Sequence, residues 1–276
     1  MKDKYVYALL WASTIVTAMI LIFILGFVVQ KGSLALSVEF LIDIPRRGGE
    51  AGGIFPAILG TFYLVIIALV VAVPLGVGGA LYLVEFQKEN IITKIIRFGA
   101  DTLNAIPSII FGLFGFAFLV YYLKLGVCIL SGGVTLAFMV LPTILRTSEE
   151  ALRAVPNWDK EGSYALGATK LQTIKNIVLP QSLSGIITGI VLSIGRAAGE
   201  TAPIIFTAAI LNPVLPESVF DPTMSLPSHL YTLVSESTPE KLVNAYGTAL
   251  VLIILVLITT YSAMLFRKYF TRHVRR

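Results

Sequence analysis

The stretch FPAILGTFYLVIIALVVAVPLGVGGALYLV, residues 55–84, decides the fold class, because none of its 30 residues is charged. A helix rises about 1.5 Å per residue, so roughly 20 apolar residues cross a hydrocarbon core about 30 Å thick. The stretch is long enough to span a membrane with some tilt, and Pro56 suits the first turn of its helix. Pro74 lacks a backbone donor and is expected to kink or break that helix.

The composition of the whole chain agrees with this interpretation. Of its 276 residues, 56% are hydrophobic and only 13% are charged, whereas a soluble domain carries roughly 25% charged residues. This excludes an ordinary soluble enzyme, and the apolar content excludes a disordered chain. A single cysteine, Cys128, excludes a disulfide framework and most cysteine metal sites. The two histidines offer little for a zinc or histidine-based catalytic centre, so we expect no metal, and His229, in a proline-rich outer connection, is expected at the surface.

Six apolar runs are long enough to span, and a lone strand in lipid would leave its backbone groups unpaired. The sequence therefore predicts an all-α integral membrane protein, a single six-helix domain over residues 1–276. The predicted spans are residues 7–29, 55–84, 105–123, 126–146, 183–211 and 246–267.

Positive charges predict the orientation of the bundle. One set of connections and both termini carry fifteen Lys and Arg residues, and the opposite connections carry five. This places both termini in the cytoplasm. It also favours lipid over nucleic acid as the partner of the basic residues, because these are spread over four segments. The basic C-terminus is interpreted as an anchor to anionic lipid.

The inner connection 147–182 contains EGSYALGATKLQTIKNIVLP, residues 161–180. Residues 161–175 suit a helix that bends at Gly167, with Tyr164, Leu171, Ile174 and Ile177 on one apolar face. Gly162 and Gly167 have the glycine spacing of a phosphate-binding loop, but Ala-Thr follows where Lys-Ser/Thr is required. The chain is therefore not expected to bind ATP itself. An amphipathic helix on the lipid surface is the alternative.

Arg196 and Glu200 are two charges within the predicted fifth span, at the i, i+4 spacing of a helical ion pair. Charges in a span face the bundle interior and often mark a pathway. Ser193 and Thr207 lie on roughly the same stripe, so the sequence predicts a wet path along it. A purely structural ion pair is the alternative.

Two sets of motifs carry a family resemblance. Glu161, Gly167, Ile177 and Leu179-Pro180 match the "EAA" loop of ATP-binding-cassette importer permeases, with Gly162-Ser163 in place of its two alanines. The segments GRAAGETAP at 195–203, IPSIIFGLFG at 106–115 and GGIFPAILGT at 52–61 resemble those of the phosphate permeases PstA and PstC. The short N-terminus and single six-span unit are closer to PstA.

The resemblance implies a type I importer permease for inorganic phosphate in a prokaryotic inner membrane, not an enzyme. It implies a PstC-like second permease, a PstB-like ATPase dimer that binds ATP, and a periplasmic phosphate-binding protein. The resemblance assigns coupling to the ATPase to Glu161, Gly167, Ala168, Ile177, Leu179 and Pro180. Two alternatives stay open: an importer of the same class for another oxyanion or solute, and an ion-coupled secondary carrier.

Overall fold

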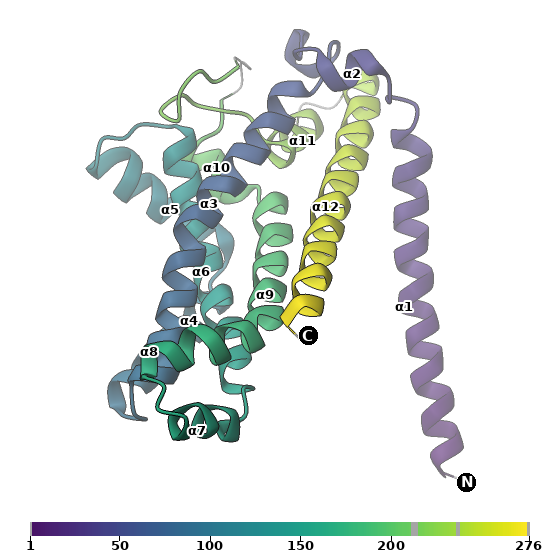
Figure 1. Cartoon of the computed structure of the whole chain (residues 1–276). Helices are drawn as coiled ribbons and strands as arrows, with labels where there is room; N and C mark the ends of the chain where they lie inside the picture. Colours follow the sequence, from purple (N-terminus) through teal and green to yellow (C-terminus); the bar gives the residue numbers. More distant parts are fainter. Residues whose placement is uncertain (1, 211–214, 236–237, 275–276) are drawn as a thin grey trace.

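The computed structural model describes residues 2–210, 215–235 and 238–274, and within these ranges every regular element is helical (Figure 1). The long helices are α1 (Lys2–Gly32), α3 (Phe55–Leu81), α6 (Ile129–Arg153), α9 (Leu179–Gly199) and α12 (Pro239–Val274). Shorter helices are α2 (Val38–Ile42), α4 (Ile91–Ala105), α5 (Ser108–Gly115), α7 (Asn157–Ala165), α8 (Lys170–Thr173), α10 (Ala202–Thr207) and α11 (Leu226–Ser235). Three π-helical turns adjoin these helices: Tyr82–Phe86 extends α3, Phe116–Tyr122 extends α5, and Ile174–Val178 joins α8 to α9. Residues Arg47–Gly49 form a 3-10 turn.

Five helices in the described residues are long and apolar enough to cross a membrane, and a bent pair makes the sixth candidate. This agrees with the predicted six-helix membrane bundle. The bent pair joins Ile91–Ala105 to Ser108–Tyr122 at an angle of 101°. The predicted inner loop 85–104 is therefore mostly helix α4, which Asn90 caps by accepting the backbone N–H of Thr93 at 2.9 Å.

Two expectations about helix continuity are wrong. The second span does not break at Pro74, because α3 continues to Leu81. The fifth span does not run from 183 to 211. Its helix is continuous from Lys170 to Gly199, where it stops.

The core lies where α3 packs against α6, the most extensive helix pair (Figure 1). Small residues bring the two backbones together, as is usual in membrane bundles. A Cβ built on Gly76 would lie 2.8 Å from Ile144 Cγ2, and one on Gly133 would lie 2.5 Å from Ile67 Cγ2. Gly112 of α5 packs in the same way against Ala202 and Pro203 of α10. The glycines of the predicted third span thus allow close packing of its helix.

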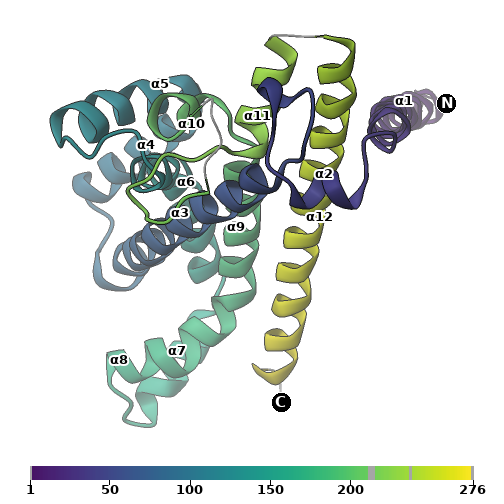
Figure 2. The ribbon, with the colours of Figure 1, turned by 90° about the horizontal axis from the view of Figure 1, so that it is seen from above.

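Helix α1 stands apart from this core, on the far side of α12 (Figure 2). The apolar window of α1 has none of its residues buried, whereas the corresponding windows of the other spans are 17–61% buried. Its contacts with other described residues are confined to its C-terminal end, where Phe27 meets Tyr246 edge to face at 5.6 Å between ring centroids. Within the part of the chain that the structure describes, the first span is therefore almost unpartnered.

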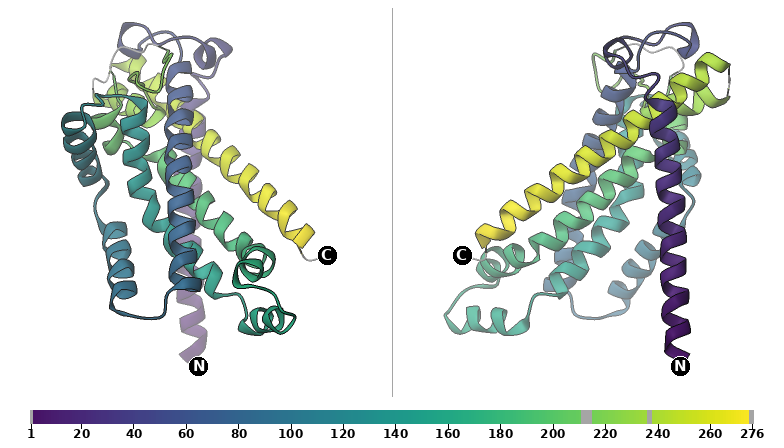
Figure 3. Two further views of the ribbon diagram at one scale, coloured as in Figure 1. Left: turned by 60° about the vertical axis from the view of Figure 1, so that its left-hand side comes forward. Right: turned by 90° about the vertical axis from the view of Figure 1, so that its right-hand side faces the viewer.

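The end of the bundle at α2 and α11, opposite α7 and α8 (Figure 3), carries a structured cap. Asn244 Nδ2 donates to the Gly49 carbonyl at 2.8 Å and ties the loop before α3 to α12. His229 of α11 lies beneath this loop and is only 4% exposed, and burial lowers its pKa to about 4. The expectation of a surface histidine in this proline-rich segment is wrong, because the glycine-rich loop covers it.

Candidate functional site

The candidate site lies at a break between α9 and α10. Glu200 leaves the helix with φ −77° and ψ 135°, and α10 begins at Ala202. Pro203 explains the break: within a continuous helix it could not donate to the carbonyl of Gly199, and its ring would clash with that carbonyl. The predicted charges are therefore positioned by a helix terminus in the bundle and not by an unbroken span.

Arg196 and Glu200 come together across the break, but loosely. Arg196 Nε lies 4.0 Å from Glu200 Oε1, and the two side chains are 32% and 18% exposed. The pair is long because Glu200 no longer follows the helical path that puts i and i+4 on one face. Both groups keep part of their capacity to bind another ligand.

A second contact, which the sequence does not predict, holds Arg196. Arg196 Nη1 donates to Thr143 Oγ1 at 3.4 Å, and Thr143 Oγ1 donates to Asn104 Oδ1 at 2.8 Å. These residues come from α9, α6 and α4, so the relay joins three helices at the bend between α4 and α5. The sequence feature that points to this contact is Asn104, a polar residue directly before the predicted third span.

The other predicted path residues are enclosed. Ser193 is fully buried, and its Oγ has no hydrogen-bond partner among the described residues. Thr207 is also fully buried and donates to the Pro203 carbonyl at 2.6 Å. Because Thr207 follows the break, no single helical stripe connects it to Arg196.

The predicted coupling segment forms two short helices at the opposite end of the bundle from the cap (Figure 1). Gly167 separates α7 from α8 with φ +81°, a left-handed conformation that favours glycine, so the expected bend is confirmed. Ser163 and Thr173 hydroxyls meet at 2.9 Å across it. Gln181 Nε2 also donates to Asp159 at 2.9 Å, so α7 folds back onto the base of α9.

Large apolar side chains are exposed on α7, α8 and the turn between them, among exposed charged residues such as Glu161 and Lys175. Trp158 is 73% exposed, Leu166 91% and Leu171 69%. The expected single apolar face is wrong, because the break separates Tyr164 from the rest and Ile174 is buried. Among the predicted coupling residues, Glu161 and Gly167 are exposed, while Ala168, Ile177, Leu179 and Pro180 are half-buried.

A buried carboxylate connects α4 to the end of α6, directly before α7. Glu149 is 2% exposed and accepts from Arg97 Nε at 2.6 Å, Arg146 Nη1 at 3.0 Å and Arg153 Nε at 3.1 Å. Arg97 and Arg153 also bind Glu89, each at 2.7 Å, and hold the pKa of that carboxyl to about 2. The sequence does not predict this ion cluster, because it joins Arg97 to Glu149 and Glu89 to Arg153, which are 52 and 64 residues apart.

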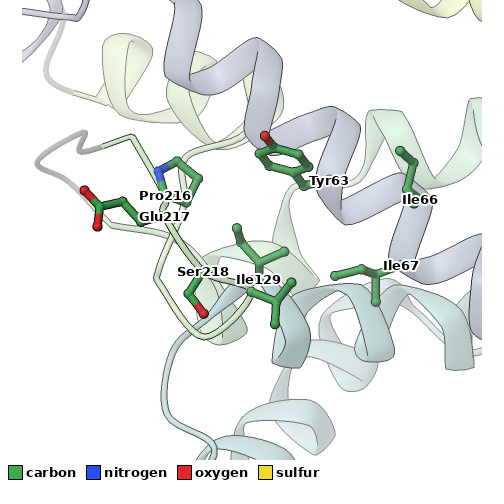
Figure 4. A pocket seen from close by; sticks show the side chains of 8 residues that line it. Tyr63, Ile66, Ile67, Ile129, Pro216, Glu217 and Ser218 are labelled. Carbon is green, nitrogen blue, oxygen red and sulfur yellow. The ribbon is translucent and has the colours of Figure 1, made fainter.

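Two cavities lie near these elements, besides an apolar one of about 510 Å³ between α3, α9 and α12. One of about 320 Å³ is on the cap side, where residues 216–219 approach Tyr63 of α3 and Ile129 of α6 (Figure 4). The other, of about 180 Å³, lies between α9 and α12 and is lined by Arg196 and Arg267. The second cavity belongs to the same part of the bundle as the candidate site.

Comparison with known proteins gives consistent results. Residues 72–276 match the family described as "Binding-protein-dependent transport system inner membrane component". The chain is 31% identical to the "Probable ABC transporter permease protein YqgI" of Bacillus subtilis, covering 95% of this chain and 93% of that protein. It is 32% identical to "Phosphate transport system permease protein PstA 1" of Mycobacterium tuberculosis strain H37Rv, covering 99% and 90%. It is 34% identical to the "Probable phosphate transport system permease protein PstA" of Methanocaldococcus jannaschii, covering 93% and 90%.

Solved structures share the fold. A bacterial ABC transporter "involved in the import of the acidic polysaccharide alginate" superposes with a TM-score of 0.63 at 15% identity, covering 95% of this chain and 97% of that one. An inward-facing structure of the MetNI methionine ABC transporter superposes with a TM-score of 0.55 at 19% identity, covering 81% and 95%.

Proposed function

This chain belongs to the family of binding-protein-dependent transport system inner membrane components, and from that premise we propose that it is the PstA-type permease of a phosphate importer. It is a multi-pass membrane subunit of an ABC importer. The named phosphate permeases that it resembles over most of its length support phosphate as the cargo.

The observation that carries the proposal is the placement of Arg196. It is the one charged residue of α9, it lies beside a helix break, and its ion pair to Glu200 is long. A guanidinium binds phosphate oxygens through two parallel N–H groups. Glu200 neutralises Arg196 when no anion is bound, and it accepts the hydrogen of a protonated phosphate oxygen. Thr143 holds one nitrogen of the fork, and Asn104 fixes the direction of the threonine hydrogen.

The family also supplies the partners. An importer of this class pairs two permeases with an ATPase and a substrate-binding protein. We propose a PstC-like second permease, a PstB-like ATPase dimer that alone binds ATP, and a periplasmic phosphate-binding protein that docks on the cap. Both termini are then cytoplasmic. The unburied apolar surface of α1 is available to the second permease.

Coupling to the ATPase is assigned to the segment from Glu161 to Pro180. Its exposed apolar side chains and its glycine bend give a compact projection, and its end is continuous with α9. A displacement of this projection is therefore transmitted along α9 to Arg196. In a cysteine cross-linking test, Leu166→Cys is the best probe because it is 91% exposed and avoids the left-handed Gly167. Cross-linking of position 166 to a lipid-facing probe only, and never to the ATPase, would refute the assignment.

Phosphate uptake into vesicles by the reconstituted importer tests the function. Arg196→Gln and Glu200→Gln should each abolish most uptake while the complex still assembles, as judged by gel filtration. Near-normal uptake by both variants would refute a role of Arg196 and Glu200 in the phosphate path. The anion that stimulates ATP hydrolysis most identifies the cargo, so greater stimulation by sulfate or molybdate than by phosphate contradicts the phosphate assignment.

A further inference from the structure

The inner end of α3 is bound by two cations from the two short helices of the coupling segment. Lys160 of α7 places its Nζ 2.5 Å from Glu85 Oε1, and the two side chains are only 14% and 6% exposed. Lys170 of α8 places its Nζ 4.6 Å from the centre of the Phe86 ring. Because α7 and α8 lie on opposite sides of the glycine bend, both halves of the segment are attached to one π-helical turn, Tyr82–Phe86.

The ion pair between Glu85 and Lys160 is enclosed by the bundle. Glu85 is the first charged residue after the uncharged stretch 55–84. Val84, which precedes it, packs against an apolar cluster formed by Ala80, Leu152, Val155 and Val178. Removing one partner of such a pair leaves the other charge buried without compensation, whereas an exposed pair contributes little. The pair therefore holds α7 firmly against the end of α3.

The outer end of α3 is bound to the cap, also by buried contacts. The Thr61 hydroxyl accepts the backbone N–H of Leu226, the first residue of α11, at 2.8 Å, and both residues are buried. Gly60 lies so close to the Met224 carbonyl that no Cβ would fit. From Thr61 to Glu85 the helix continues without a break for about 36 Å at 1.5 Å per residue. α3 thus connects two ends of the bundle that lie opposite each other (Figure 3).

We propose that α3 is a second transmission element beside α9, and that Glu85 is the positioning residue that couples α7 to the cap through it. Energetic coupling between distant sites is carried by rigid elements and packed side chains, and close packing against α6 stiffens α3. A displacement of α7 therefore moves α11 at the other end of the same helix. The inference rests on the proposed docking of the coupling segment to an ATPase, but it does not depend on which cargo is carried.

The test follows the cap of the whole importer while ATP is added. Tyr231 of α11 is 57% exposed, so Tyr231→Cys can carry an environment-sensitive fluorophore, whereas the native Cys128 is fully buried. Lys160→Met removes the inner contact of α3. Lys88→Met is the matched control, because Lys88 is an exposed cation in the connection that follows the same turn. Fluorescence is recorded in lipid nanodiscs and uptake of inorganic phosphate in vesicles, both expressed per assembled complex.

In the wild-type complex, ATP should change the fluorescence at position 231 without any cargo. Lys160→Met and Glu85→Gln should each lower that amplitude about threefold and phosphate uptake about tenfold, as expected for residues in direct contact. Lys88→Met should keep both. The double variant should be no weaker than either single variant, because both remove the same contact. A pair that only stabilised the fold would reduce the number of assembled complexes and leave the amplitude per complex unchanged.

The proposal is overturned if ATP does not change the fluorescence at position 231 in the wild-type complex. It is also overturned if Lys160→Met matches Lys88→Met in amplitude or in uptake, or if the losses of the two single variants multiply in the double variant. If the wild-type complex moves no phosphate, the proposed function fails and the amplitude alone decides on α3. Should neither single variant assemble, Glu85→Asp replaces them, because it keeps the charge and withdraws the carboxylate by one methylene. A lower amplitude than that of Lys88→Met then supports the proposal, and an equal one overturns it.

Discussion

Replacing Glu149 by Gln should be among the most destabilising single-atom changes available in this chain. The variant keeps the size of the side chain and removes the charge that three arginines share. Glu149 is 2% exposed, so water cannot substitute for the lost acceptor. An amide in its place also turns two donors toward a group of donors.

The magnitude follows from the exposure of the three arginine side chains. Arg146 and Arg153 are 31% and 47% exposed, so water recovers much of what they lose. Arg97 is 17% exposed and its Nη2 already lacks a partner among the described residues. A buried hydrogen bond to a charged group contributes about 1.5–3 kcal/mol, and breaking a buried ion pair costs about 3–5 kcal/mol. We therefore expect a loss of about 3–5 kcal/mol, most of it through Arg97.

The assay is reversible denaturant unfolding of the detergent-solubilised chain. Glu150→Gln is the control, because Glu150 is the exposed neighbour in the same helix and should change stability by less than about 0.5 kcal/mol. A double-mutant cycle with Arg97→Gln should give a coupling energy of about 2 kcal/mol. The argument fails if Glu149→Gln stays within 1 kcal/mol of Glu150→Gln, or if the cycle is additive.

Three further predictions follow from other parts of the structure. Because burial lowers the pKa of His229 to about 4, the unfolded chain alone binds this proton between pH 6.5 and 4. The contribution of His229 to the free energy of unfolding should therefore be complete above pH 6.5 and fall by about 1.4 kcal/mol per pH unit as the pH decreases through that window. Thermal unfolding at pH 7.5 and pH 5 should show this loss. A His229→Gln variant whose stability has the same dependence on pH would contradict it. Thr143→Val should reduce phosphate uptake about tenfold and Thr143→Ser less than twofold, because only the hydroxyl connects Arg196 to Asn104; equal uptake by both would show that the relay is not used. Gly76→Val should destabilise the bundle by about 1–3 kcal/mol, because its new Cβ meets Ile144 at 2.8 Å; unfolding at an unchanged denaturant midpoint would refute close packing at this point.

Long-range and local features differ in how far the sequence predicts them. Apolar runs identify the spans because lipid imposes their length and composition, and Gly167 marks a bend because few other residues adopt φ +81°. Pro203 also indicates the break at Glu200, but the apolar content of residues 183–211 favours one continuous span and outweighs that local signal. Helix α4 was missed because its amphipathic residues resemble a polar connection until Asn90 is recognised as its cap.

The contacts at the candidate site depend on the placement of whole helices. Thr143 is 39 residues from Asn104 and 53 residues from Arg196, so no local pattern brings the three together. The same is true of Glu149, which lies 52 residues from Arg97. Charge and polarity singled out Arg196 and Glu200, but only the fold shows that Glu200 is a distant partner and that Thr143 holds the guanidinium.

The isolation of α1 bears on how the protein is made. Its residues are synthesised before those of the other described spans, yet its apolar surface contacts the rest of the described chain almost only near Phe27 and Tyr246. The remaining spans can therefore reach their native arrangement without it. A helix made before the other described spans is then covered by protein after them, and a newly made chain presents that surface to lipid until another subunit arrives.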